Sequence, residues 1–253
     1  ARALAAAESA VREQMLGMSA HLVPDDVVRR QALPKVIAFF VEDEALRQEL
    51  VAIEPLAIFY GFMALSCVAP LLVMTSAGLY AHDLASGATR FVLTRCDRLA
   101  WSLGKLLGHA ALLALGLLVG ALATAVVAQL AAGIDAFSII WLLRAVFRAW
   151  VYGLSYLGIF SAISLASRVP SRARALSVVV LFALWVGHSI CDSSYWTARV
   201  PPLALAVWLF PAEYQHRLWS PSWLESLPAL LALPSLGALA FATGFALFRR
   251  LDA

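Results

Sequence analysis

The residues best suited to binding a partner or a ligand are concentrated in one stretch between two long uncharged runs. Residues 82–105 read HDLASGATRFVLTRCDRLAWSLGK. An acid, Asp83, stands near the start, and the basic residues are Arg90, Arg95, Arg98 and Lys105. Residues 83–95 can form an amphipathic helix, because Leu84, Phe91 and the basic side chains fall at helical positions. Such a helix can lie on anionic lipid or dock into a groove of a protein partner.

A second polar cluster, His188, Cys191 and Asp192, stands at the end of another apolar run. A soft metal can use His and Cys three positions apart on one helical face. Only two such ligands are present, without a second pair. The cluster is therefore better explained as polar residues at a membrane boundary, and we predict no metal site.

Arg144 and Arg148 lie four positions apart, beside Trp141, Phe147 and Trp150. This pattern predicts an amphipathic segment at the outer membrane surface, with both arginines reaching lipid headgroups. Binding of an anionic substrate is the alternative.

The motifs of common enzymes are missing from the sequence. It contains no GxxxxGK[ST] phosphate loop, no GxSxG, no HExxH and no paired CxxC. We therefore predict that the chain is not an enzyme, has no ATPase of its own and binds no cofactor directly. Its apolar runs also lack Asp, Glu, Lys and Arg, which disfavours an ion-coupled carrier.

The composition is that of a helical membrane protein. Hydrophobic residues make up 62% of the 253 residues, charged residues only 14%, and the mean hydropathy is +0.82. Soluble domains contain about 25% charged residues. The apolar runs are continuous and far longer than the roughly ten-residue alternating strands of a membrane β-barrel. We predict an all-α, polytopic membrane fold.

Five uncharged runs predict five transmembrane helices, because about 20 apolar residues span a bilayer. They cover residues 55–81, 106–134, 149–167, 175–191 and 226–248 of a transmembrane domain over 55–253. Residues 192–225 form an outer region. Within it, the apolar residues 200–212 are bounded by prolines, are too few for a span, and fit a re-entrant or interfacial helix.

Basic residues predict the orientation. Nine of them lie in three segments on one side by parity: the loop 82–105, the loop 168–174 and the C-terminal tail. The positive-inside rule places these segments and the C-terminus in the cytoplasm. Residues 1–54 are then outside, as a small helical extracytoplasmic segment that can dock a partner there. Its translocation requires a further span upstream, so we expect six spans in the full protein.

Two pairs of glycines, Gly104/Gly108 and Gly116/Gly120, have the four-residue spacing that lets helices approach closely. Ordinary packing within the membrane domain is the favoured interpretation. Dimerisation through this face is the alternative.

The stretch 82–105 resembles the signature of ABC transporter type 2 permeases. That signature has an acidic residue, three residues, Gly-Thr, a run ending in Arg, and Gly-Lys at the head of the next span. The matching positions here are Asp83, Gly87, Arg90, Phe91, Arg95, Arg98, Gly104 and Lys105. Ala88 replaces the usual Thr, with Thr89 next to it, and Cys96 stands where Pro is common. The turn SRVPSRARA at 167–175 and the ending LFRRLDA are similar to the corresponding segments of that family.

The resemblance implies the membrane subunit of an exporter in a bacterial inner membrane, in contact with lipid. Two permeases, identical or different, would pair, and two nucleotide-binding ATPase subunits carrying ATP and Mg²⁺ would dock beneath them. The matching residues would couple ATPase closure to the membrane domain, with Arg168, Arg172 and Arg174 as a smaller second contact. A non-transporting membrane anchor or scaffold that recruits a cytoplasmic partner is the alternative function. No nucleic-acid partner is predicted.

Overall fold

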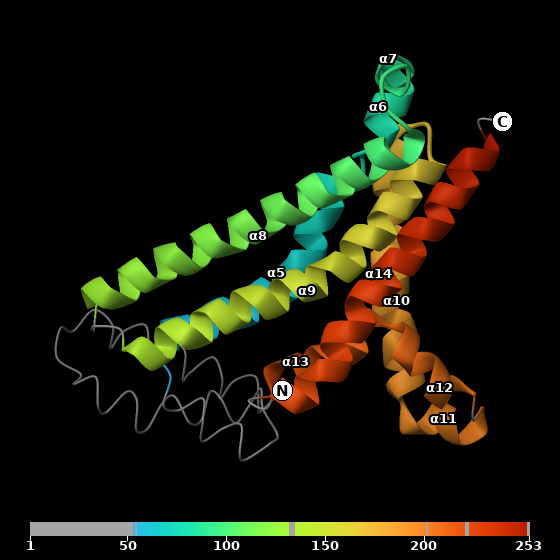
Figure 1. Ribbon diagram of the computed structural model, residues 1–253. Coiled ribbons are helices and arrows are strands. Elements are labelled where there is room, and N and C mark those ends of the chain that lie inside the picture. The colour runs from blue at the N-terminus through green and yellow to red at the C-terminus, as the bar shows by residue number, and fades with distance from the viewer. Residues whose placement is uncertain (1–52, 54, 132–134, 201, 221–222, 252–253) are drawn as a thin grey trace. The chain divides into compact units, whose positions relative to one another are not determined.

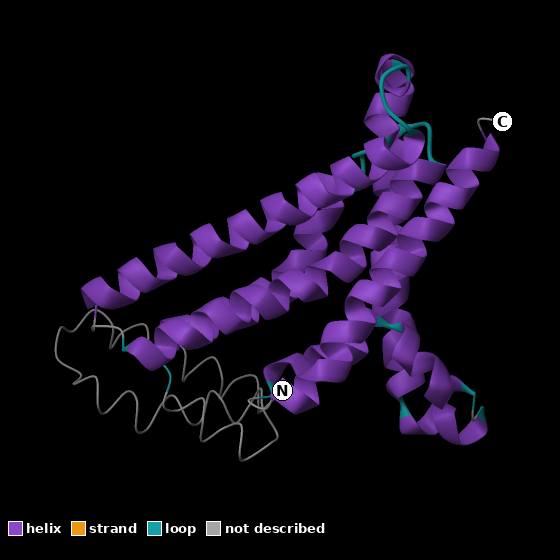
Figure 2. Ribbon diagram, viewed as in Figure 1, coloured by secondary structure: helices purple, strands orange, loops and turns teal. Residues whose placement is uncertain are grey.

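The computed structural model describes residues 53, 55–131, 135–200, 202–220 and 223–251. Every regular element in this part is a helix, and no strand occurs there (Figure 1, Figure 2). The five long helices are α5 (Pro55–Ser76), α8 (Arg98–Ala131), α9 (Ala136–Ala166), α10 (Pro170–Asp192) and α14 (Trp223–Leu251). The shorter elements are α6 (Ala81–Ser86), α7 (Ala88–Leu93), α11 (Ser194–Arg199), α12 (Leu203–Ala206), the 3-10 helices η2 (Val207–Leu209) and η3 (Pro211–Tyr214), and α13 (Gln215–Trp219). The predicted segment 1–54 falls outside the described residues, except for Ile53.

Each long helix is apolar and long enough to cross a membrane. The candidate spans contain 23 to 33 residues. A helix needs about 20 predominantly apolar residues to span a bilayer. The chain is therefore a multi-pass helical membrane protein, which confirms the predicted all-α fold with five spans.

Four of these helices begin earlier than their uncharged runs predicted. Helix α8 begins at Arg98 instead of 106, α9 at Ala136 instead of 149, α10 at Pro170 instead of 175, and α14 at Trp223 instead of 226. Helices continue from the hydrocarbon into the headgroup region, where charged residues are tolerated, so an uncharged run marks only the inner part. At α9, the Asp135 carboxylate accepts the Ser138 N–H at 3.0 Å, and this N-cap determines where the helix starts.

Helix α9 is the centre of the membrane domain. Its most apolar part is 67% buried within the protein, against 11% for α8 and for α10. The buried core around it includes Val68 and Leu72 of α5, Tyr156 and Phe160 of α9, and Leu233 of α14. Helices α8 and α10 leave most of their surface outside this packing.

Helices α9 and α14 are in backbone contact at three glycines. A Cβ atom on Gly158 of α9 would lie 2.1 Å from the carbonyl oxygen of Gly237 on α14. A Cβ on Gly237 would lie 2.5 Å from the carbonyl oxygen of Leu154, and one on Gly244 would lie 2.4 Å from the Cα of Ala162. Small residues permit this approach, and the van der Waals contact that results stabilises the helix pair in lipid.

The glycines of α8 do not make the predicted contacts within the chain. Among the described residues, no atom lies within 4 Å of a Cβ built on Gly104, Gly108 or Gly116. Of the four, Gly120 alone is packed, with an atom of the Tyr60 ring at 3.1 Å. Spacing alone therefore pointed to the wrong helix, because it does not say which face of the helix meets a neighbour. Dimerisation through α8 stays a prediction.

The three basic segments that were predicted to share a side do meet at one end of the membrane domain, here called the α7 end. Helices α6 and α7 connect α5 to α8 at this end. Tyr80, just before α6, is bonded to Ser164 near the end of α9. Trp101, in the first turn of α8, packs against Phe248 near the end of α14, with ring centres 6.1 Å apart. The α9–α10 turn and the last turn of α14 therefore lie beside the α6–α7 connection.

The region 192–225 at the opposite end folds into several short helices, not the single helix expected over 200–212. Phe210 has an extended backbone, and η3 begins at Pro211. A proline restricts the residue before it to extended conformations, which interrupts the helix at this point. The end of α13 packs against α9, where the rings of Trp141 and Trp219 lie 5.9 Å apart.

Candidate functional site

The connection between α5 and α8 consists of two short helices separated by Gly87. Gly87, with φ +74°, is the one residue of positive φ in the described part of the chain. Its N–H donates to the carbonyl oxygen of Leu84 at 3.4 Å, which ends α6, and α7 begins at the next residue. The sequence predicted one amphipathic helix over 83–95. The left-handed conformation at Gly87, which glycine adopts without strain, divides it in two.

An ion pair joins the two ends of the stretch that resembles a permease signature. The ammonium of Lys105, on the second turn of α8, contacts the carboxylate of Asp83 on α6. It also donates to the carbonyl oxygen of Leu79 at 3.1 Å. The nitrogen lies 5.9 Å from the centre of the Tyr80 ring and 5.6 Å from a ring of Trp101, within the range of cation–π attraction. Lys105 therefore belongs to α8 and not, as predicted, to the end of a loop.

Neutral contacts fix the start of α6 against α8 and α9. The Ser164 hydroxyl of α9 accepts the N–H groups of Tyr80 and Ala81 at 2.9 and 3.1 Å. The Tyr80 hydroxyl donates to the carbonyl oxygen of Ser102 at 2.7 Å. Tyr80 is fully buried, and its ring packs edge-on against Trp101 with centres 5.5 Å apart. Buried polar groups generally need partners, and here those partners attach α6 to two spans.

Helix α7 and the turn after it present three of the other predicted residues to the outside of the protein. The Phe91 side chain is 80% exposed, and Arg90 and Arg95 are exposed too. Figure 1 shows α7 at the tip of the connection, beyond the ends of the long helices. Arg98 is directed elsewhere, since its guanidinium lies 5.8 Å from the ring centre of Phe248 on α14. An exposed aromatic ring close in sequence to two exposed arginines suits a partner with both apolar and acidic groups.

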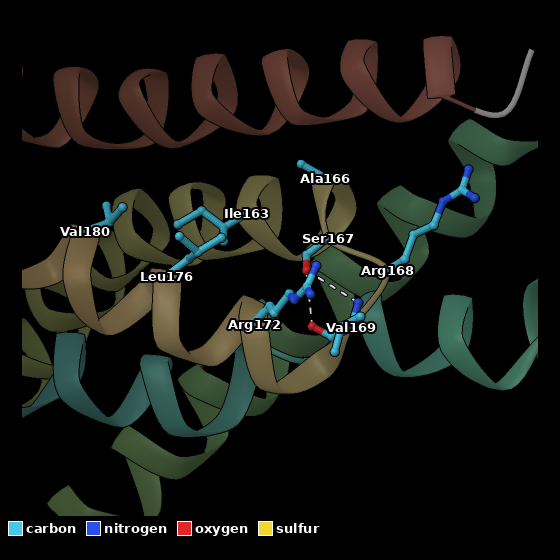
Figure 3. A pocket seen from close by; sticks show the side chains of 8 residues that line it. All are labelled: Ile163, Ala166, Ser167, Arg168, Val169, Arg172, Leu176 and Val180. Atoms are coloured by element: carbon cyan, nitrogen blue, oxygen red, sulfur yellow. Dashed lines mark hydrogen bonds between the residues drawn. The ribbon is translucent and has the colours of Figure 1, made fainter.

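The three arginines of the second predicted contact face different surroundings. Arg168 lies between α9 and α10, whereas Arg172 and Arg174 lie at the start of α10. The Nε of Arg174 lies 3.5 Å from the position that a Cβ of Gly78 would take, in the turn after α5. Arg168 and Arg172 line a hollow between the end of α9 and the start of α10 (Figure 3). Arg174 therefore lies beside the turn leading into α6.

The residues that hold α6 in place were not predicted from the sequence. Tyr80 and Ser164 stand in uncharged runs, where nothing distinguishes them from residues that face lipid, and Trp101 is an apolar residue between Arg98 and Lys105. One signal was present for Ser164, because a hydroxyl inside a span commonly hydrogen-bonds to another part of the protein.

In the cluster of His188, Cys191 and Asp192, the histidine has an acidic neighbour. The Nε2 of His188 lies 3.4 Å from a carboxylate oxygen of Glu213 in η3, and Cys191 is buried. In the described part of the chain, no three His, Cys, Asp or Glu side chains gather as a metal site.

Arg148 is buried, and its guanidinium donates to the carbonyl oxygen of Ser220 at 2.8 Å. The prediction that Arg148 reaches lipid headgroups is therefore wrong, because the turn after α13 covers this part of α9.

Comparisons of the chain with models of protein families, with curated proteins and with solved structures find no match. The fold itself defines the class: a multi-pass helical membrane protein with five spans in its described part.

Proposed function

We propose that the chain is the transmembrane permease subunit of an ATP-driven ABC exporter that works with a separate nucleotide-binding subunit. In this proposal the α7 end faces the cytoplasm of a bacterium, and α7 docks on the ATPase. That ATPase binds ATP and Mg²⁺, and a second permease copy completes the membrane unit. The concentration of basic residues at the α7 end supports this orientation through the positive-inside rule.

The observation that carries the proposal is the ion pair between Asp83 and Lys105. It attaches α6 to the second turn of α8, so the α6–α7 connection is not a free loop. A partner that displaces α7 would move the start of α8 with it, and also α9 through Ser164. An element that transmits motion needs such attachments, whereas a segment that only lies on lipid does not.

The exposed residues of α7 and of the turn that follows it support a protein partner. Phe91 offers an apolar anchor, and aromatic anchors of this kind often dominate the binding energy of an interface. Arg90 and Arg95 can pair with acidic groups around that anchor, which gives orientation and a faster encounter.

Co-purification from the native membrane tests the proposal. The full chain is isolated in a mild detergent, and we expect a bound protein that carries a Walker A motif and hydrolyses ATP. Replacing Arg90 and Arg95 together by Glu should reduce recovery of that protein roughly tenfold or more, because the charge attraction at the docking surface is reversed.

The double variant Arg249→Glu, Arg250→Glu is the matched control, since these arginines are exposed at the same end of the molecule. It should leave recovery of the ATPase unchanged. Equal losses in both variants would mean that the docking surface is not α7. A bound protein without ATPase activity would favour the membrane anchor over the exporter.

A further inference from the structure

A hollow of about 430 Å³ lies between the end of α9 and the start of α10. Ile163, Leu176 and Val180 line one part of it, and Ser167 and Arg172 lie at the other end (Figure 3). Small-ligand sites in proteins have volumes of about 300–1,000 Å³. The hollow therefore has room for a ligand that is apolar at one end and polar at the other.

The position of the hollow matches the two layers of a bilayer. It lies where the span α9 ends at Ala166 and the span α10 begins at Pro170, so its polar end is at headgroup level. The apolar part follows α10 toward the hydrocarbon layer. Leu176 is 51% exposed, and α10 leaves most of its surface outside the protein core. The hollow thus opens sideways toward lipid.

Arg172 supplies the charge at the polar end. It is exposed and forms no ion pair with another described residue. The Ser167 hydroxyl is occupied, since it donates to the carbonyl oxygen of Val169 at 3.1 Å. Arg168 also lines the hollow, but Figure 3 shows its guanidinium directed away from Arg172. Residues 136–191, which include Arg172 and most of α9 and α10, contain no Asp or Glu. No acid of this stretch therefore neutralises the charge of Arg172.

We propose that the hollow binds one anionic phospholipid, with its phosphate on Arg172 and an acyl chain against Ile163, Leu176 and Val180. The planar guanidinium can give a phosphate two parallel hydrogen bonds. A zwitterionic lipid carries a cationic group that cancels the attraction, so a headgroup of net negative charge is favoured. A free phosphate has no apolar part to fill the hollow.

A docked protein is a weaker fit to the same hollow. It could contact Arg172, but it would leave the apolar part, at the depth of the hydrocarbon layer, without an occupant. The inference requires only that α9 and α10 span a membrane. It therefore holds or fails independently of the exporter function.

Native mass spectrometry of the purified, delipidated full chain tests the site. Dioleoyl phosphatidylglycerol and dioleoyl phosphatidylcholine, which have the same acyl chains, are titrated separately. The first phosphatidylglycerol should bind the wild-type chain roughly tenfold more tightly, because it gains a charge-assisted contact without an opposing cation. Arg172→Gln should abolish most of this preference, and Arg249→Gln, an exposed arginine at the same end, should retain it.

A second variant tests the apolar part of the site. Val180→Trp fills the hollow and should weaken both lipids by a similar factor, with folding verified by gel filtration and circular dichroism. Equal binding of the two lipids to the wild-type chain would overturn the proposal, as would equal behaviour of Arg172→Gln and Arg249→Gln. Displacement of the lipid by an equal concentration of glycerol phosphate would assign the site to a soluble phosphate. Loss of the ATPase from Arg172→Gln with unchanged lipid affinity would make this turn a protein contact.

Discussion

Lys105, at the α7 end, contacts a carboxylate, a backbone carbonyl oxygen and two aromatic rings. Its side chain is 27% exposed and that of Asp83 is 25% exposed, so water partly screens the pair. An ion pair of this exposure contributes at most about 1 kcal/mol. The carbonyl oxygen of Leu79 and the rings of Tyr80 and Trp101 add to this, and they make Lys105 the more important partner of the two.

A double-mutant cycle with Asp83→Asn and Lys105→Met measures the pair. We expect a coupling free energy of about 1 kcal/mol in chemical unfolding in detergent micelles. Lys105→Met should destabilise the protein more than Asp83→Asn, because it also removes the contacts to Leu79 and to the two rings. Strictly additive effects would show that the two side chains do not interact in solution.

Gly87 gives a prediction that depends on backbone conformation alone. No atom lies within 4 Å of a Cβ built at this position, so a larger residue meets no steric barrier from its neighbours. Gly87→Ala should nevertheless lower the free energy of unfolding by about 1 kcal/mol, because an L-residue with a side chain resists a positive φ. Gly87→Asn should cost less, since Asn tolerates this conformation better. Equal stability of the wild type and both variants would contradict the break between α6 and α7.

Among the helices, α9 and α14 form the most closely packed pair that the glycines reveal. Their backbones meet without intervening side chains at Gly158 and Gly237, and again at Gly244. In lipid, where no hydrophobic effect drives helices together, this close contact is a main source of association. The pair therefore behaves as one element of the fold.

Gly158→Ala tests this contact, because the new methyl group would lie 2.1 Å from the carbonyl oxygen of Gly237. The helices would have to separate, and we expect the free energy of unfolding to fall by about 1–3 kcal/mol. Gly116→Ala in α8 is the control, since open space surrounds that position. It should leave stability unchanged or raise it by up to about 1 kcal/mol. Equal effects in thermal unfolding of the two variants would argue against the α9–α14 contact.

At the scale of elements, the apolar runs predicted the number and order of the spans because length and hydropathy suffice for that. They could not place the starts of α8 and α9, since α8 continues back to Arg98 past Lys105, and α9 continues back to its N-cap Asp135 past Arg148 and Arg144. They also could not separate the packed Gly158 from the unpacked Gly108. That distinction depends on which face of each helix meets a neighbour, which a single sequence does not encode locally.

The orientation of the whole molecule in the membrane can be tested with its three natural cysteines. Cys96 is half-buried at the α7 end, Cys67 lies inside the span α5, and Cys191 is buried. If the α7 end faces the cytoplasm, a membrane-impermeant maleimide should label Cys96 in inverted vesicles and not in intact cells. Cys96→Ser should abolish the signal, and adding Ser171→Cys at the exposed start of α10 should restore it from the same side. Labelling of intact cells would reverse the orientation.

The candidate site was predictable from sequence only in part, and for a definite reason. Asp83 and Lys105 stood out because charges are rare in this chain, but their pairing arises from the helical start of α8. The partners of Tyr80 and Ser164 could not be predicted, because a neutral residue in a membrane span gives no local sign of which residue it contacts.

Two hydrogen-bonding residues of α9, one near its end and one near its middle, have a mechanical consequence. Ser164 holds the start of α6, and Arg148 holds the turn after α13. The two residues are roughly 24 Å apart along one helix at about 1.5 Å per residue. A displacement of α6 would therefore also act on the turn after α13, because both are hydrogen-bonded to helix α9. Helix α9 therefore connects the α7 end to the turn after α13, and α14, which is joined to α9 by glycine contacts, would move with it.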